Sequence, residues 1–101
     1  MSGEAIQFDA EQLRRYCVDQ GIRRIRVYGS VNRPDFDPAR SDIDVLVDFI
    51  PGRTPGFRFF ELADGLARIL GRPVDLSTER MISRHFRDEV LRQARVLYDA
   101  A

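Results

Sequence analysis

The sequence SDIDVLVDFI at residues 41–50 alternates apolar side chains with three aspartates. Alternation with a period of two is typical of a β-strand, because successive side chains of a strand point to opposite faces. Asp42 and Asp44 therefore share one face, roughly 6.6 Å apart along the backbone. Two carboxylates at this spacing repel one another, and a divalent cation removes that repulsion. The stretch predicts a strand from Asp42 to Ile50 that carries two potential metal ligands.

A third carboxylate occurs in a shorter β-like stretch, RPVDLS, at residues 72–77. The apolar residues on either side of Asp75 are expected to face the core, which turns Asp75 to the opposite face. If the two strands are neighbours, Asp75 lies beside Asp42 and Asp44. Three carboxylates of this kind suit Mg²⁺, which prefers hard oxygen ligands. The sequence contains no His/Cys cluster that would favour zinc instead.

A Gly29-Ser30 pair follows a predicted strand at Ile22–Tyr28 and precedes the aspartate pair by twelve residues. Glycine lets a ligand approach the main chain, and a helical turn after Ser30 would point backbone N–H groups at an anion. A Gly-Ser pair alone is usually an ordinary turn, but the aspartates that follow indicate a phosphate site. Arg33 and Arg40, in the same loop, are each either a triphosphate ligand or a solvated loop arginine.

Three helices are expected, at residues 9–20, 57–70 and 79–95. Asp9 is the predicted N-cap of the first helix, and Gly21 and Gly71 are the predicted ends of the first two. Val96–Tyr98 either extends the last helix or forms a final edge strand. Strands that alternate with helices predict an α/β fold, in which one small sheet is covered by helices.

Composition restricts the class of protein. A length of 101 residues suits one small domain, and sixteen basic residues balance sixteen acidic ones, so no overall field attracts nucleic acid or membrane. All sixteen basic residues are arginine, so no lysine can serve as a nucleophile. Cys17 cannot form an internal disulfide and is expected to be a buried thiol. Without a signal pattern or an apolar run of about 18 residues, we expect a soluble cytoplasmic protein.

Two further titratable residues are not expected to join the site. Asp48 shares a face with Asp44 but lies roughly 13 Å further along the strand, so a surface or turn-capping role is predicted. His85, the single histidine, falls on the last predicted helix with no nucleophile assigned to it. A surface or packing role is therefore predicted for His85, and no Ser-His-Asp or Cys-His arrangement can be assembled.

Taken together, these residues resemble the minimal nucleotidyltransferases (MNT proteins) of the DNA polymerase β superfamily. That family carries a Gly-Ser turn, an Asp-x-Asp pair some ten residues later, and a third Asp on a later strand. The corresponding residues here are Gly29-Ser30, Asp42-Ile43-Asp44 and Asp75. The resemblance covers nearly the whole chain, and it implies a polymerase β-like core with a small mixed sheet, formed by residues 1–101 as one minimal nucleotidyltransferase domain.

The resemblance also implies a chemistry. Asp42, Asp44 and Asp75 would be the catalytic and metal-binding residues, and would hold two Mg²⁺ ions between the α-phosphate of ATP and the attacking hydroxyl. Asp75 would bind the metal nearer the nucleophile and take its proton.

The loop between the first two strands is where the phosphates would bind and where the resemblance is less complete. Gly29, Ser30 and Arg33 would hold the β- and γ-phosphates. Many family members carry Ala-Arg-Gly where this chain has Asn32-Arg33-Pro34. Arg33 matches, whereas Pro34 fixes a backbone angle where glycine would be free.

Small members of this family are similar to the antitoxins of HEPN–MNT toxin–antitoxin pairs. The resemblance thus implies transfer of AMP from ATP to a tyrosine of a HEPN ribonuclease toxin, which would be the partner in a hetero-oligomer. Two alternatives stay open: a nucleotidyltransferase that acts on a small-molecule hydroxyl, and a non-catalytic antitoxin that only binds its toxin. The short chain argues against the first, and the presence of all three aspartates argues against the second.

Overall fold

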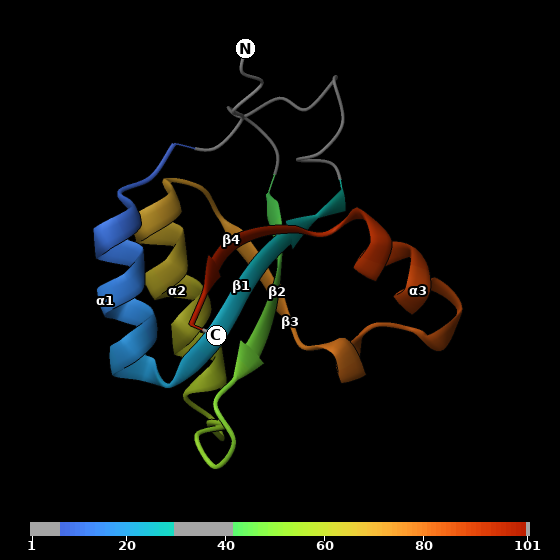
Figure 1. Ribbon diagram of the computed structural model, residues 1–101, viewed down its shortest axis with the longest axis horizontal. Helices are drawn as coiled ribbons and strands as arrows, with labels where there is room; N and C mark the ends of the chain where they lie inside the picture. Colours follow the sequence, from blue (N-terminus) through green and yellow to red (C-terminus); the bar gives the residue numbers. More distant parts are fainter. Residues whose placement is uncertain (1–6, 30–41, 101) are drawn as a thin grey trace.

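The computed structural model describes residues 7–29 and 42–100. A sheet lies in the middle of the molecule, with α1 (Ala10–Gln20) and α2 (Phe59–Leu70) against one face (Figure 1). The third helix, α3 (Arg84–Gln93), lies on the opposite side (Figure 1). None of the helices in the described ranges is both long enough and apolar enough to cross a lipid bilayer.

The sheet has four strands in the order β3-β2-β1-β4. Their bounds are Ile22–Tyr28 for β1, Ile43–Phe49 for β2, Val74–Ser77 for β3 and Arg95–Asp99 for β4. β1 runs antiparallel to both β2 and β4, whereas β2 and β3 are parallel. Parallel neighbours need a crossover connection, and α2 provides it. The predicted small mixed sheet flanked by helices is confirmed.

Local capping signals explain where the first two helices begin and end. The Asp9 carboxylate accepts hydrogen bonds from the backbone N–H groups of Glu11 and Gln12, at 2.9 and 3.1 Å, and so caps α1 as predicted. α1 and α2 end at Gly21 and Gly71, both in the left-handed conformation that glycine adopts most readily.

The core lies between the sheet and the α1–α2 layer. Its buried apolar side chains come from both helices and from one face of β1, β2 and β3: Leu13, Cys17, Ile22, Ile25, Val27, Ile43, Val45, Val47, Leu62, Leu66, Leu70 and Leu76. Cys17 is fully buried, and burial raises the pKa of its thiol to about 12. The predicted buried thiol is therefore confirmed.

The single helix predicted over residues 79–95 is wrong. A short 3₁₀ helix, η2 (Glu79–Met81), is followed by an extended Ile82, with ψ at 133°. The Ser83 hydroxyl then accepts the backbone N–H of His85 at 3.3 Å and starts α3 as a new N-cap. After α3 the chain enters β4, so the edge strand, one of the two predicted alternatives, is the observed one.

The face of the sheet opposite α1 and α2 is charged and partly covered. The Arg26 side chain is only 8% exposed and lies between Asp48 and Glu79, with N–O distances of 3.0 and 3.2 Å. Arg24 also contacts Asp48, at 2.9 Å. Asp48 is therefore an ion-pair partner of two arginines on this face, and the predicted surface or turn-capping role of Asp48 is wrong. Charges this far from water need partners, because a buried charge left alone costs several kcal/mol.

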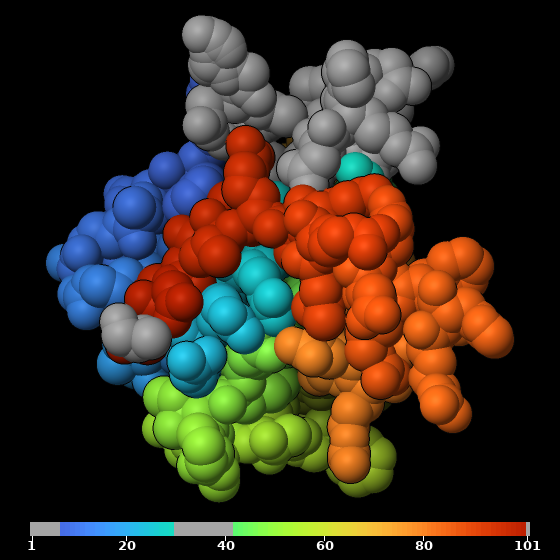
Figure 2. Space-filling model, turned by 45° about the vertical axis from the view of Figure 1, so that its right-hand side comes forward, coloured from blue at the N-terminus to red at the C-terminus, as the bar shows by residue number. Residues whose placement is uncertain are grey.

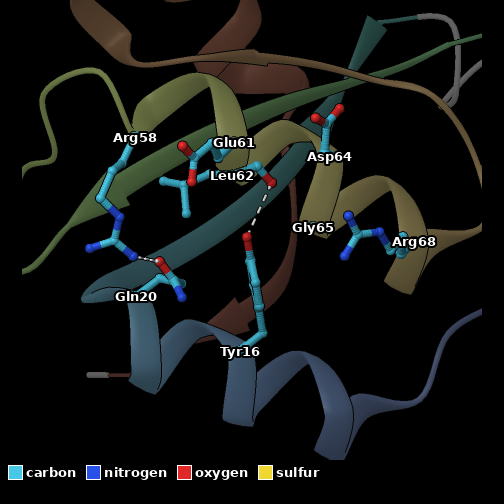
Figure 3. A pocket seen from close by; sticks show the side chains of 8 residues that line it. All are labelled: Tyr16, Gln20, Arg58, Glu61, Leu62, Asp64, Gly65 and Arg68. Carbon is cyan, nitrogen blue, oxygen red and sulfur yellow. Dashed lines mark hydrogen bonds between the residues drawn. The ribbon is translucent and has the colours of Figure 1, made fainter.

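Tyr16 of α1 projects towards α2 beside Gly65 (Figure 3). Its hydroxyl donates a hydrogen bond to the Leu62 carbonyl at 3.4 Å. A Cβ atom added to Gly65 would overlap the Tyr16 hydroxyl. The absence of a side chain in the middle of α2 thus makes room for a tyrosine of the neighbouring helix.

We expect Gly65→Ala to lower the free energy of unfolding by about 1 kcal/mol, because overlap with Tyr16 outweighs the better helix propensity of alanine. In a Tyr16→Ala background the overlap is gone, and the same substitution should raise stability by about 1 kcal/mol. Urea denaturation of the four proteins measures both effects. An equal effect of Gly65→Ala in the two backgrounds would contradict this packing role.

Candidate active site

Asp44 and Asp75 lie side by side on neighbouring strands. β2 and β3 are paired so that Asp44 is directly opposite Asp75, and β1 places Tyr28 opposite Asp44 on the other side. Paired positions on neighbouring strands are roughly 4.8 Å apart and direct their side chains to the same face. The expectation that the strand of Asp75 neighbours the strand of Asp44 is confirmed, and the two carboxylates belong to one row across the sheet.

The electrostatics of this row centre on Asp44. Burial raises the pKa of the Asp44 carboxyl group, and the negative charges of Asp75 and Asp42 raise it further. Asp44 is half-buried, whereas Asp42 and Asp75 are exposed. The three carboxylates are therefore close enough to repel one another, and the least solvated of them is in the middle.

The donor set suits a hard divalent cation. Across residues 7–29 and 42–100, no three His, Cys, Asp or Glu side chains are grouped so that they could hold a metal ion. Of the predicted metal ligands, Asp44 and Asp75 are paired in register, and Asp42 stands just before β2 begins. Mg²⁺ is commonly bound by one or two carboxylates and completes its shell with water and substrate phosphate. A pair of repelling carboxylates, of which Asp75 is exposed, fits that mode of binding.

Gly29 leaves room for the Asp44 carboxylate. Its φ angle is +76°, in the left-handed region that glycine adopts without strain. A Cβ atom at this position would also overlap Oδ2 of Asp44. Two independent constraints therefore require glycine where β1 ends. The predicted phosphate ligands Ser30 and Arg33, and the alternative Arg40, lie outside the described residues.

Tyr28 is a member of the row that the sequence reasoning missed. Burial raises the pKa of its phenol most, a hydrogen-bonding interaction with Ser77 lowers it, and the charges of Asp44 and Asp75 raise it. The available signal was the period of two in β1, which puts Tyr28 on the same face as Arg26. A tyrosine immediately before the Gly-Ser turn could therefore have been assigned to the site.

The other polar features lie away from this row. Asp48 is held by the two arginines of β1, and His85 is exposed on α3. A cavity of about 270 Å³ lies between α1 and α2 (Figure 3). These two helices cover the face of the sheet that carries the core side chains, which is opposite to the face of the carboxylates. Its lining contains none of the predicted site residues.

One protein family and several known proteins match this chain. A family model described as a nucleotidyltransferase domain matches residues 10–98. A protein of Methanocaldococcus jannaschii named "putative protein adenylyltransferase" is 43% identical over 56 residues, which are 54% of this chain and 54% of the relative. The matched part thus spans about half the length of that curated relative.

Two solved structures share the fold. One, described as a "putative minimal nucleotidyltransferase", is 36% identical with a TM-score of 0.59, and the match covers 88% of this chain and 96% of that one. The other is the crystal structure of a toxin–antitoxin with AMP-PNP, which is 26% identical with a TM-score of 0.67. That match covers 90% of this chain and 73% of the other.

We expect Asp44→Asn to raise the melting temperature at pH 7 in metal-free buffer. A carboxyl pKa raised by folding means that ionisation opposes folding, so wild-type loses stability as the pH rises from 3.8 through the folded pKa. The gain from asparagine should shrink on acidification and vanish near pH 3.8, the ordinary value. Thermal melts from pH 8 to pH 4 measure it, with the exposed Asp64→Asn as control. A lower melting temperature for Asp44→Asn at pH 7 would count against the repulsion.

The two roles of Gly29 can be separated with Gly52, whose φ is +84° and whose added Cβ would contact nothing within 4 Å. Gly52→Ala should cost only the backbone strain, about 1–2 kcal/mol. Gly29→Ala should cost about 1 kcal/mol more, because it also displaces the Asp44 carboxylate. It should also weaken Mn²⁺ binding in a calorimetric titration, which Gly52→Ala should not. Identical behaviour of the two variants would rule out the contact with Asp44.

Proposed function

The chain belongs to the nucleotidyltransferase domain family, and on that premise we propose that it transfers AMP from ATP to a tyrosine of a partner HEPN-type toxin. The observation that carries the proposal is the in-register pair of Asp44 and Asp75, within a family match that spans residues 10–98. The likeness to a toxin–antitoxin with AMP-PNP supports an adenine nucleotide as substrate and a toxin as the class of partner.

The proposed metal ligands are Asp42, Asp44 and Asp75, for two Mg²⁺ ions. Support comes from the carboxylate repulsion centred on Asp44, which a cation would relieve. Magnesium, when bound, supplies the positive charge that stabilises the attacking and leaving oxygens of the transferred phosphoryl group.

The residues have separate roles in the proposed transfer. The tyrosine oxygen attacks the α-phosphorus of ATP, so a new P–O bond forms while the bond to the bridging oxygen breaks and pyrophosphate leaves. Asp75 accepts the phenolic proton. Gly29, which has no side chain, lets the nucleotide approach the main chain next to Asp44. Ser30 and Arg33 are the proposed ligands of the β- and γ-phosphates.

A protein acceptor suits the described site better than a small molecule does. Asp42 and Asp75 are exposed on the face of the sheet opposite the cavity between α1 and α2. Small-molecule sites are typically concave and bury most of their ligand. A tyrosine carried by another protein brings its own surroundings and can reach exposed carboxylates.

The experiment that tests this proposal combines the purified chain, ATP labelled on the α-phosphate, Mg²⁺ and a purified candidate HEPN-type toxin. We expect label on a tyrosine of the partner, located by mass spectrometry. Asp44→Asn and Asp75→Asn should each reduce the transfer rate about 10²–10⁴-fold, whereas the exposed Asp64→Asn should not.

Two results would overturn the proposal. Inhibition of the toxin with no transfer of label would indicate an antitoxin that acts by binding alone. Transfer to a small-molecule hydroxyl such as that of an aminoglycoside, with none to the protein, would indicate the other alternative.

A further inference from the structure

The segment formed by η2 and α3 exposes apolar side chains. Met81 is 58% exposed and Phe86 is 65% exposed, and none of the residues of α3 is buried. Figure 2 shows this segment as a ridge that projects from the rest of the molecule. Large apolar side chains gathered on a projecting element often mark a site of protein–protein contact.

Exposed positive charge accompanies these apolar side chains. Arg80 and Arg84 are exposed, and neither forms an ion pair within the described part of the chain. Of the nearby acids, Glu79 pairs with Arg26 and Glu89 pairs with Arg92, whereas Asp88 is exposed one helical turn after Arg84. We call Arg80, Met81, Arg84 and Phe86 the η2–α3 surface. Its charge complements a partner that is acidic around an apolar centre.

The η2–α3 surface is fixed relative to the carboxylates. β3, which carries Asp75, ends at Ser77, and η2 begins two residues later at Glu79. The buried Arg26 side chain holds Glu79 at 3.2 Å, and Arg87 of α3 donates to the Ile82 carbonyl at 3.1 Å. η2 contacts β2, the strand of Asp44, and α3 lies on the same side of the sheet (Figure 1).

From this arrangement we propose that the η2–α3 surface docks the acceptor protein of the transfer reaction, with Phe86 as the apolar anchor and Arg84 as a charged contact. The inference rests on the proposed function, because the occupant is the protein that brings its tyrosine to Asp44 and Asp75. A surface that follows the strand of Asp75 can hold an acceptor on the side of the sheet where Asp75 is exposed. Neither Phe86 nor Arg84 takes part in the transfer itself.

The test uses two pairs of variants. Phe86→Ser removes the anchor, and its control is Phe60→Ser, an aromatic residue of α2 that is 73% exposed. Arg84→Glu reverses a charge, and its control is Arg68→Glu, an exposed arginine of α2. The probe is the purified HEPN-type toxin to which this chain transfers AMP in the experiment above, or, without transfer, the candidate HEPN-type toxin used there. Its dissociation constant is measured by calorimetry without nucleotide, and AMP transfer and the melting temperature are measured in parallel.

We expect Phe86→Ser to weaken binding of the HEPN-type protein about 10- to 100-fold, as the loss of a central anchor typically does. Arg84→Glu should weaken it about 10-fold at low salt and less at high salt. Both variants should raise the KM for the acceptor protein with little change in kcat, and should retain the wild-type thermal shift with ATP and Mg²⁺. The controls Phe60→Ser and Arg68→Glu should match wild-type.

Several outcomes would overturn the inference: wild-type that does not bind the probe, Phe86→Ser that binds it normally, or controls that weaken binding equally. A second copy of the chain would be the occupant instead if sedimentation shows a dimer that Phe86→Ser dissociates. A nucleic acid would be the occupant instead if the wild-type chain binds single-stranded RNA and Arg84→Glu abolishes that binding. If wild-type binds the HEPN-type protein and Phe86→Ser weakens that binding, but wild-type transfers no AMP, the surface is upheld as the docking site. Only the proposed chemistry is then refuted.

Discussion

The register between two parallel strands is the constraint on which the site depends. Val45 and Leu76 are paired in β2 and β3, and both are buried against the α1–α2 layer. A slip of one residue would turn these apolar side chains to the charged face, so the hydrophobic core strongly opposes it. The same register sets Asp44 beside Asp75 one position earlier. Burial of the core thus supplies the free energy that holds two like charges together.

The charged face of the sheet is divided into two parts with different electrostatics. Towards η2, Asp48 is neutralised by Arg24 and Arg26, and these side chains fix the packing of η2 on the sheet. Towards Gly29, burial raises the pKa of the Asp44 carboxyl group, and the charges of the nearby Asp75 and Asp42 raise it further. One part of the face is therefore electrically satisfied and structural, whereas the other has excess negative charge that suits a cation and a phosphate.

The sequence predicted those features whose causes are local. The period of two in β2, the Asp9 cap and the Gly21 and Gly71 ends depend on neighbouring residues only, and each is observed. The break in the last predicted helix depends on whether the Ser83 hydroxyl accepts a hydrogen bond from the backbone N–H of His85. This local hydrogen bond competes closely with continuation of the helix. The burial of Arg26 depends on Glu79, 53 residues away, and no local pattern encodes that contact. Within the site, alternation indicates that Asp44 and Asp75 share a face and that Tyr28 lies on the face of Arg26, whereas the position of Tyr28 directly opposite Asp44 required the register of β1 against β2.

The most direct measurement is the anomalous scattering of Mn²⁺ in crystals of this chain soaked with the metal and a non-hydrolysable ATP analogue. The account predicts a Mn²⁺ peak within about 2.2 Å of a carboxylate oxygen of both Asp44 and Asp75. It also predicts that the α-phosphate of the analogue contacts the same ion. Crystals in which the analogue is bound, but in which Mn²⁺ contacts neither carboxylate, would contradict the claim that this in-register pair is the metal site of a nucleotidyltransferase.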